Sequence, residues 1–145
     1  MPVNGRAVSM GVQAALTAAT GRSCGYGTAP TAASLPTGAT IPYYVLYALG
    51  QVTSGPPFGD ATADSRVLFQ ITTVSNAVDQ CEFWADKARA ALLGRLPRAG
   101  WATPIAVTGG VVINRELDKE EGMSVSSGVY SYIQRYVITV TPKTT

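Results

Sequence analysis

The feature that most constrains this chain is a change of apolar period near its middle. Residues 65–75 alternate apolar and other side chains like a β-strand, whereas apolar residues recur every three or four positions across 76–94. A strand that runs directly into an amphipathic helix favours a sheet with that helix packed on it. The helical side chains that we expect to be buried are Val78, Cys81, Trp84, Ala88 and Leu92, with Ala85 and Ala91 in the same stripe.

This predicted helix has its own start and stop signals. Asn76 is a good N-cap, Asp79 lies three residues on, and Gly94 follows the last apolar residue. Cys81 lies within the apolar stripe, and the chain has no histidine that could activate a thiol. We therefore expect Cys81 to be a core residue and not a nucleophile.

The remaining periodic segments predict one more helix and three more strands. The helix covers 8–20 and ends at Gly21, and its stripe consists of Val8, Val12, Ala15, Leu16 and Ala19. The strands are expected near 41–50, 107–121 and 129–142. Segment 41–50 is apolar on both faces, so it should be central in a sheet or covered on both sides. The third strand should place Val111, Ile113 and Leu117 on one face. The last should share one face among Tyr130, Tyr132, Gln134, Tyr136, Ile138 and Val140.

Together these segments predict a single α+β domain over residues 1–145, in the order α-β-β-α-β-β. The expected architecture is a four-stranded, mostly antiparallel sheet with the helices packed on one face. A loop at about 23–40 is rich in Gly, Pro, Ala, Ser and Thr and is long for a connection inside a compact domain. We expect neighbouring subunits to order this loop.

The surface of the folded chain should be poor in charge. Only 14% of the residues are charged, against roughly 25% in typical globular chains. So low a charged fraction is typical of a protein that buries part of its surface in an assembly. The net charge of +2 is too small to indicate binding to nucleic acid or to an anionic membrane. No membrane span or leader is apparent, which predicts a chain made in a reducing compartment. Pairing of Cys24 with Cys81 stays open.

Charged residues are nevertheless dense in "RELDKEEG". Its carboxylates include Glu116 and Asp118, which a small hydrolase could use, and Asp118 with Glu120, which could hold a divalent ion. Acids that alternate with bases at a strand end are more typical of a solvated hairpin tip. The tyrosines of the last strand could stack bases as in single-strand binders, but only Arg135 accompanies them. We expect no metal, no cofactor and no enzymatic activity.

The order of the parts is more specific than any one motif. A short helix and a Gly/Pro loop precede "IPYYVLYALG", then "SRVLFQITTVSNAVDQCEFWADKARAALLG", and "INRELDKEEG" precedes "YIQRYVITV". This order resembles the tail terminator (tail-completion, minor tail protein U-like) family of long-tailed bacteriophages. The resemblance spans nearly the whole chain, and 41–94 carries most of it. The long uncharged loop departs from the family pattern.

The resemblance implies a non-enzymatic virion protein at the head-proximal end of the tail, assembled in the host cytoplasm. It implies a homohexameric ring that caps the tail tube, ends tube polymerisation and joins the tail to the head connector or stopper protein. Genomic DNA would pass through the lumen without sequence-specific binding, and no membrane would be involved. The residues expected at the subunit or tube interface are Phe58, Arg115, Glu116, Asp118, Lys119, Glu120 and Glu121.

Three alternatives remain open at this point. Another neck component, such as a head–tail stopper or adaptor, would also form a ring. A small carboxylate hydrolase would require a pocket around Glu116 and Asp118. A single-strand nucleic-acid binder would show strongly salt-dependent binding.

Overall fold

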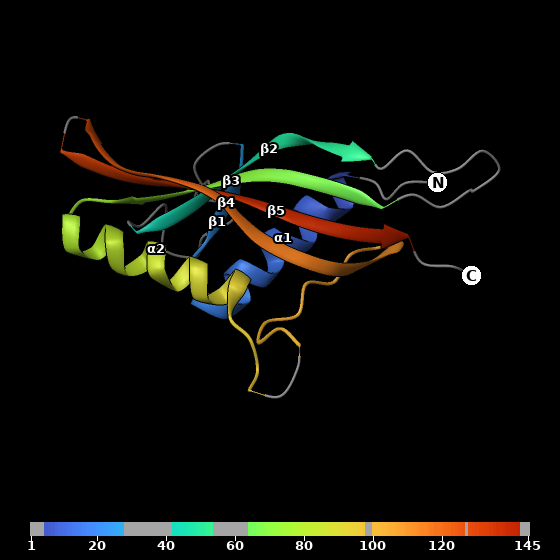
Figure 1. Cartoon of the computed structure of the whole chain (residues 1–145). Coiled ribbons are helices and arrows are strands. Elements are labelled where there is room, and N and C mark those ends of the chain that lie inside the picture. The colour runs from blue at the N-terminus through green and yellow to red at the C-terminus, as the bar shows by residue number, and fades with distance from the viewer. Residues whose placement is uncertain (1–4, 28–41, 54–63, 98–99, 127, 143–145) are drawn as a thin grey trace.

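The computed structural model describes residues 5–27, 42–53, 64–97, 100–126 and 128–142. Its elements are α1 (Gly5–Thr20), β1 (Cys24–Tyr26), β2 (Tyr43–Thr53), β3 (Ser65–Ser75), α2 (Val78–Leu93), β4 (Gly110–Ser126) and β5 (Val129–Pro142). Both helices lie on the same side of one five-stranded sheet (Figure 1). The fold is α+β as predicted, in the order α-β-β-β-α-β-β, with one strand more than expected.

The strand order across the sheet is β1-β2-β3-β5-β4. The β2–β3 pair is antiparallel, with Tyr43 opposite Val74. β3 and β5 also pair antiparallel, as do β5 and β4. Strands β1 and β4 therefore form the two edges of the sheet.

The missed strand is β1, which lies in the segment predicted to be a loop. It pairs in parallel with β2, and Cys24 stands opposite Tyr44. The backbone N–H of Tyr44 donates to the carbonyl of Ser23 at 2.9 Å, and that of Gly27 donates to the carbonyl of Leu46 at 2.7 Å. Three residues are too few to show a period, so only pairing with β2 defines this strand. The rest of the predicted loop, 28–40, lies outside the described residues.

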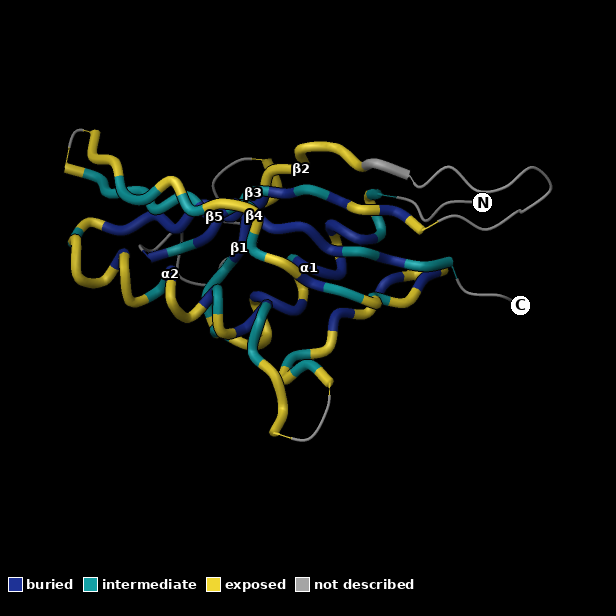
Figure 2. The backbone as a smooth tube through the Cα atoms, viewed as in Figure 1, coloured by how far each residue is buried: buried dark blue, intermediate teal, exposed yellow. Residues whose placement is uncertain are grey.

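The core lies between the helices and the inner face of the sheet. Phe69 and Ile71 of β3, and Tyr136 and Ile138 of β5, are fully buried there, which confirms the predicted shared face of β5 for its second half. The rings of Phe69 and Tyr136 stack with centroids 6.1 Å apart. Figure 2 shows the buried stretches of the backbone in dark blue, in the strands of the sheet and in α1.

The apolar stripes of the two helices are shorter than predicted. In α1 the buried stripe ends at Leu16, and Ala19, one residue before the end of the helix, is exposed. In α2 Cys81, Ala88 and Leu92 are fully buried, as predicted. Val78 is 46% exposed because it begins the helix, ahead of the turns that pack on the sheet.

Two further predictions about α2 also need correction. The helix begins after Ala77, not Asn76, and no side chain caps its first turn. Trp84 is half-buried and packs at the margin of the core. The hydroxyl of Tyr44 donates to the backbone carbonyl of Trp84 at 2.6 Å, and the guanidinium of Arg22 lies 5.0 Å from the Trp84 ring.

Strand β2 is covered on both sides only in its first half. Tyr44, Val45 and Leu46 are buried where β1 pairs with β2. β1 ends opposite Leu46, and beyond it Tyr47 and Leu49 are exposed at 38% and 45%. β2 lies between β1 and β3 in the sheet, as one of the two predicted alternatives requires, but its second half extends past β1 and is not covered on both sides.

Strand β4 differs most from prediction. Bulges between Val112 and Asn114, between Leu117 and Lys119, and between Glu120 and Gly122 shift its pairing with β5 three times. Each bulge adds one residue and turns the following side chains to the other face. The first bulge therefore separates Val111 and Ile113, which are exposed, from Leu117, which packs against the core. The inner face of β4 is instead formed by Val112, Arg115, Leu117, Glu120 and Met123, which pair with inner-face residues of β5.

None of the helices in the described ranges is both long and apolar enough to cross a bilayer. The same ranges contain no group of three or more His, Cys, Asp or Glu residues placed to hold a metal ion.

Candidate interaction surface

The charged span 115–121 lies in the middle of β4 and not at a hairpin tip. β4 continues to Ser126, five residues past Glu121, before the chain turns into β5. The expectation of a solvated tip is therefore wrong. Because β4 is an edge strand, its charges are spread along one border of the sheet, where a partner could contact them.

Glu120 points to the helical side and joins α2 to the sheet. Its carboxylate accepts a hydrogen bond from Arg89 Nε at 3.0 Å and pairs with Arg89 Nη2, and Gln134 Nε2 donates to it at 2.9 Å. Burial by itself raises the pKa of Glu120, but the hydrogen bonds from Gln134 and Arg89 and the Arg89 charge outweigh burial, so the pKa lies below its ordinary value. The hydrogen bond from Glu120 likewise raises the pKa of Arg89.

Glu116, Lys119 and Glu121 are exposed on the opposite side of β4. Glu116 lies 4.0 Å from Arg66 of β3, and Glu121 accepts an ion pair from Arg135 of β5 at 3.1 Å. Both acids remain accessible: the side chain of Glu116 is 54% exposed and that of Glu121 is 31% exposed. Asp118, at the second bulge, is exposed as well. These side chains form an open border of alternating charge.

Arg115 differs from its neighbours because it is buried. Only 5% of its surface is exposed, and its Nη1 donates to the carbonyl of Leu92, at the end of α2, at 3.2 Å. Its Nε atom is buried without a hydrogen-bond partner, and no carboxylate in the described part of the chain lies within ion-pair distance. Burial lowers the pKa of Arg115, but a guanidinium stays protonated in proteins. Arg115 is thus a buried, uncompensated positive charge.

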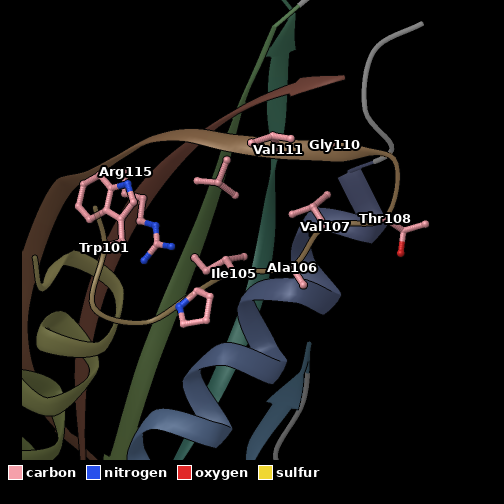
Figure 3. Close-up of a pocket in the computed structure, with 10 residues that line it drawn as sticks. Trp101, Ile105, Ala106, Val107, Thr108, Gly110, Val111 and Arg115 are labelled. Atoms are coloured by element: carbon pink, nitrogen blue, oxygen red, sulfur yellow. The ribbon is translucent and has the colours of Figure 1, made fainter. Parts of the chain in front are cut away.

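Arg115 lines a pocket between β4 and the segment that follows α2 (Figure 3). The pocket has a volume of about 580 Å³, and its walls include Trp101, Ile105, Val107, Val111 and Val112. The Arg115 guanidinium lies 4.8 Å from the Trp101 ring, and that of Arg95 lies 4.3 Å from the same ring. Two cations therefore flank one aromatic side chain beside an apolar cavity.

The close approach of α1 holds this pocket wall in place. A Cβ atom at Gly11 would lie 2.3 Å from the carbonyl oxygen of Ala106, so only glycine allows the segment this close to the helix. Ile105 and Val107 on either side of it are buried in the core. The wall at 105–107 is consequently part of the fold and not a loose loop.

Arg95 and Trp101 follow α2, where the sequence pattern predicted only the end of a helix, so neither was predicted as a site residue. A tryptophan near arginines in a Gly/Pro-rich segment was the available signal. Phe58, the other predicted interface residue, lies outside the described residues. Arg115 and Glu120 are engaged on the helical side, while Glu116, Asp118, Lys119 and Glu121 lie exposed along the sheet border.

The two cysteines are free and buried thiols. Burial raises the pKa of Cys24 to about 12 and also raises that of Cys81. The sulfur of Cys81 donates to the carbonyl of Thr73 at 3.4 Å. Both side chains are therefore packing residues, as predicted for Cys81.

Comparison with known proteins rests on structure. No protein-family model matches the sequence, and no curated protein matches it. The chain is similar in structure to a chain from the virion of a native gene transfer agent (GTA) particle. The alignment covers 96% of this chain and 95% of that chain, with a TM-score of 0.58 and 14% sequence identity. The described chain therefore shares its α+β fold, over nearly its whole length, with a component of a virion.

Proposed function

We propose that this chain is a non-enzymatic structural protein of a virion. It forms a ring that caps the tail tube, ends tube polymerisation and joins the tail to the head connector. The observation that carries the proposal is the shared fold with a chain of the GTA virion, which extends over 96% of this chain. The order of sequence segments, which resembles tail terminator proteins, supports the finer role.

The described surface also supports an assembled state. Large apolar side chains are exposed on both edges of the molecule and on α2, among them Val111, Ile113, Leu49 and Phe83. A chain with few charges and scattered exposed apolar residues gains by covering them in shared interfaces. In this role the partners are other copies of the chain, the tail tube protein and the connector or stopper protein. DNA passes through the lumen without sequence-specific contacts.

Within this proposal the border of β4 contacts the tube or a neighbouring subunit. Glu116, Asp118, Lys119 and Glu121 supply alternating charges, which set orientation and on-rate more than affinity. Arg115 and Glu120 act from the helical side, and Phe58 stays an expected interface residue.

Negative-stain electron microscopy of the purified chain, alone and mixed with tail tubes, tests the proposal. We expect closed rings, or single caps at one end of each tube, and tubes that no longer elongate after capping. Rings that bind a head connector but leave tube ends uncapped would identify another neck component. Monomers with no affinity for tubes would contradict a ring-forming role.

A further inference from the structure

A buried charge without a partner is the least explained feature of the described chain. Arg115 satisfies one hydrogen bond at the end of α2, while its Nε has no acceptor and no carboxylate is near. An uncompensated buried charge is destabilising unless a counter-charge approaches it. Arg115 lines an open pocket, so a carboxylate could reach it from outside.

The chemistry of the pocket defines what would fill it. Its walls are apolar side chains and the Trp101 ring, and its charges are the guanidinium groups of Arg115 and Arg95. A complementary partner presents carboxylates next to apolar side chains. A partner with polar groups alone would leave the exposed side chain of Val111 uncovered.

The outer face of α2 has this complementary composition. It includes Asp79, Phe83 and Asp86, which lie opposite the buried stripe of Cys81, Ala85 and Ala88, and Glu82 on the flank of that stripe. Phe83 is 52% exposed, and the ammonium of Lys87 lies 5.3 Å from its ring. We call Asp79, Glu82, Phe83 and Asp86 the acidic face of α2.

The acids of this face have few partners within the chain. Asp86 pairs with Arg89 at 3.1 Å, but no cation in the described ranges forms an ion pair with Asp79 or Glu82. The helix dipole accounts for an acid in the first turn, such as Asp79. It accounts less well for Glu82, and not at all for the exposed ring of Phe83 beside it.

The two surfaces lie at different ends of α2. The helix begins beneath the turn between β4 and β5, whereas the segment that carries Trp101 leaves its other end (Figure 1). A surface and its complement at separate places on one molecule give head-to-tail association, which closes into a ring when the rotation between copies allows it.

We propose that the acidic face of α2 in one copy of the chain docks on the Arg115–Trp101 pocket of the next copy. Glu82 approaches Arg95 and Arg115, and Phe83 covers the apolar wall near Val111. This contact is the repeating junction of the ring, and it rests on the ring-forming role proposed above.

Charge reversal on each side of the junction tests it. Glu82→Arg changes the acidic face, and Arg95→Glu changes the rim of the pocket, while Arg115 is kept because it also holds the end of α2. Each variant alone should need an at least about tenfold higher concentration for half-assembly, because like charges then face each other. Mass photometry measures the assembled fraction, and circular dichroism checks the fold.

Mixing the two variants gives the decisive result. In an alternating ring every junction again joins opposite charges, so the mixture should assemble at the concentration that the unmodified chain requires.

Two outcomes would overturn the junction, and they differ in what else they remove. If each single variant forms rings as readily as the unmodified chain, or if the mixture of variants does not restore assembly, this junction is rejected but the ring-forming role is not. An unmodified chain that stays monomeric both in solution and on tail tubes rejects the junction and the ring-forming role together.

Discussion

At the scale of single residues, Glu120 shows how one side chain can belong to a charged run and still serve the fold. Its carboxylate ties Arg89 of α2 to Gln134 of β5, and Gln134 also donates to the carbonyl of Ala85 at 3.2 Å. The group thus joins helix and sheet through hydrogen bonds to an ionised acceptor, which are stronger than neutral ones.

Replacing Glu120 with Gln should make folding less sensitive to acid. The folded pKa of Glu120 lies below its unfolded value of about 4.3, so its contribution is fully present above that pH and is lost as pH falls through the folded pKa. Glu120→Gln should lower the free energy of unfolding by about 1–2 kcal/mol near pH 7, and the difference from the unmodified chain should shrink on acidification.

Urea denaturation at a series of pH values measures this difference. Glu116→Gln, which removes an exposed carboxylate of the same strand, is the matched control and should change the free energy of unfolding by less than about 0.5 kcal/mol. A constant gap between the unmodified chain and Glu120→Gln down to about pH 3 would contradict the assigned role of the Glu120 charge.

At the scale of elements, the sequence predicted the segments whose own period fixes them. β3, β5 and α2 each carry an apolar pattern of 11 residues or more, and the structure confirms their type and most of their buried residues. β1 has three residues, too few for a pattern, and exists because β2 offers it a parallel partner.

β4 shows a second limit of sequence patterns. Strict alternation placed Val111, Ile113 and Leu117 on one face, and the first bulge separates the first two from Leu117. The first two bulges contain no glycine to signal them, whereas Gly122, with a φ of 82°, marks the third. The pocket around Arg115 depends on the first bulge, so it could not be predicted either.

Substitution of Gly11 in α1 tests whether the segment 105–107 packs tightly against this helix. Alanine inside a helix normally gains about 0.5–1 kcal/mol over glycine. At Gly11 the added Cβ would lie 2.3 Å from the Ala106 carbonyl oxygen, so we expect Gly11→Ala to destabilise the chain by about 1–3 kcal/mol. The midpoint of urea unfolding measures the sign of the change, and a more stable variant would show that 105–107 does not press on α1.

At the scale of the whole molecule, one face of the sheet carries both helices, and no helix in the described ranges covers the other face (Figure 1). The inner face provides the core, while the border of β4 and the open face present the charges of Glu116, Lys119 and Arg135. The fold class and the helix-on-sheet arrangement follow from the sequence. Which charges reach the surface follows only from the register.

Reversing the exposed charges of this border should disturb assembly and not folding. In Glu116→Lys with Asp118→Lys, Glu120 is kept, so the free energy of unfolding should change by less than about 0.5 kcal/mol per substitution. If the border contacts the tube as proposed, tails assembled with this variant should be overlong in electron micrographs. The neutral pair Glu116→Gln with Asp118→Asn should have a smaller effect, and tails of normal length with the reversed pair would remove the border from the contact surface.

The three bulges of β4 also affect the chain before it meets any partner. A straight edge of 17 residues would offer a continuous ladder of N–H and C=O groups on which any extended polypeptide in a crowded cell could grow as a further strand. Each bulge interrupts that ladder and bends it, which leaves only short runs of matching groups. Unassembled subunits are thereby protected from fibre growth. The border can then bind its partner through side chains without adding further strands through its backbone.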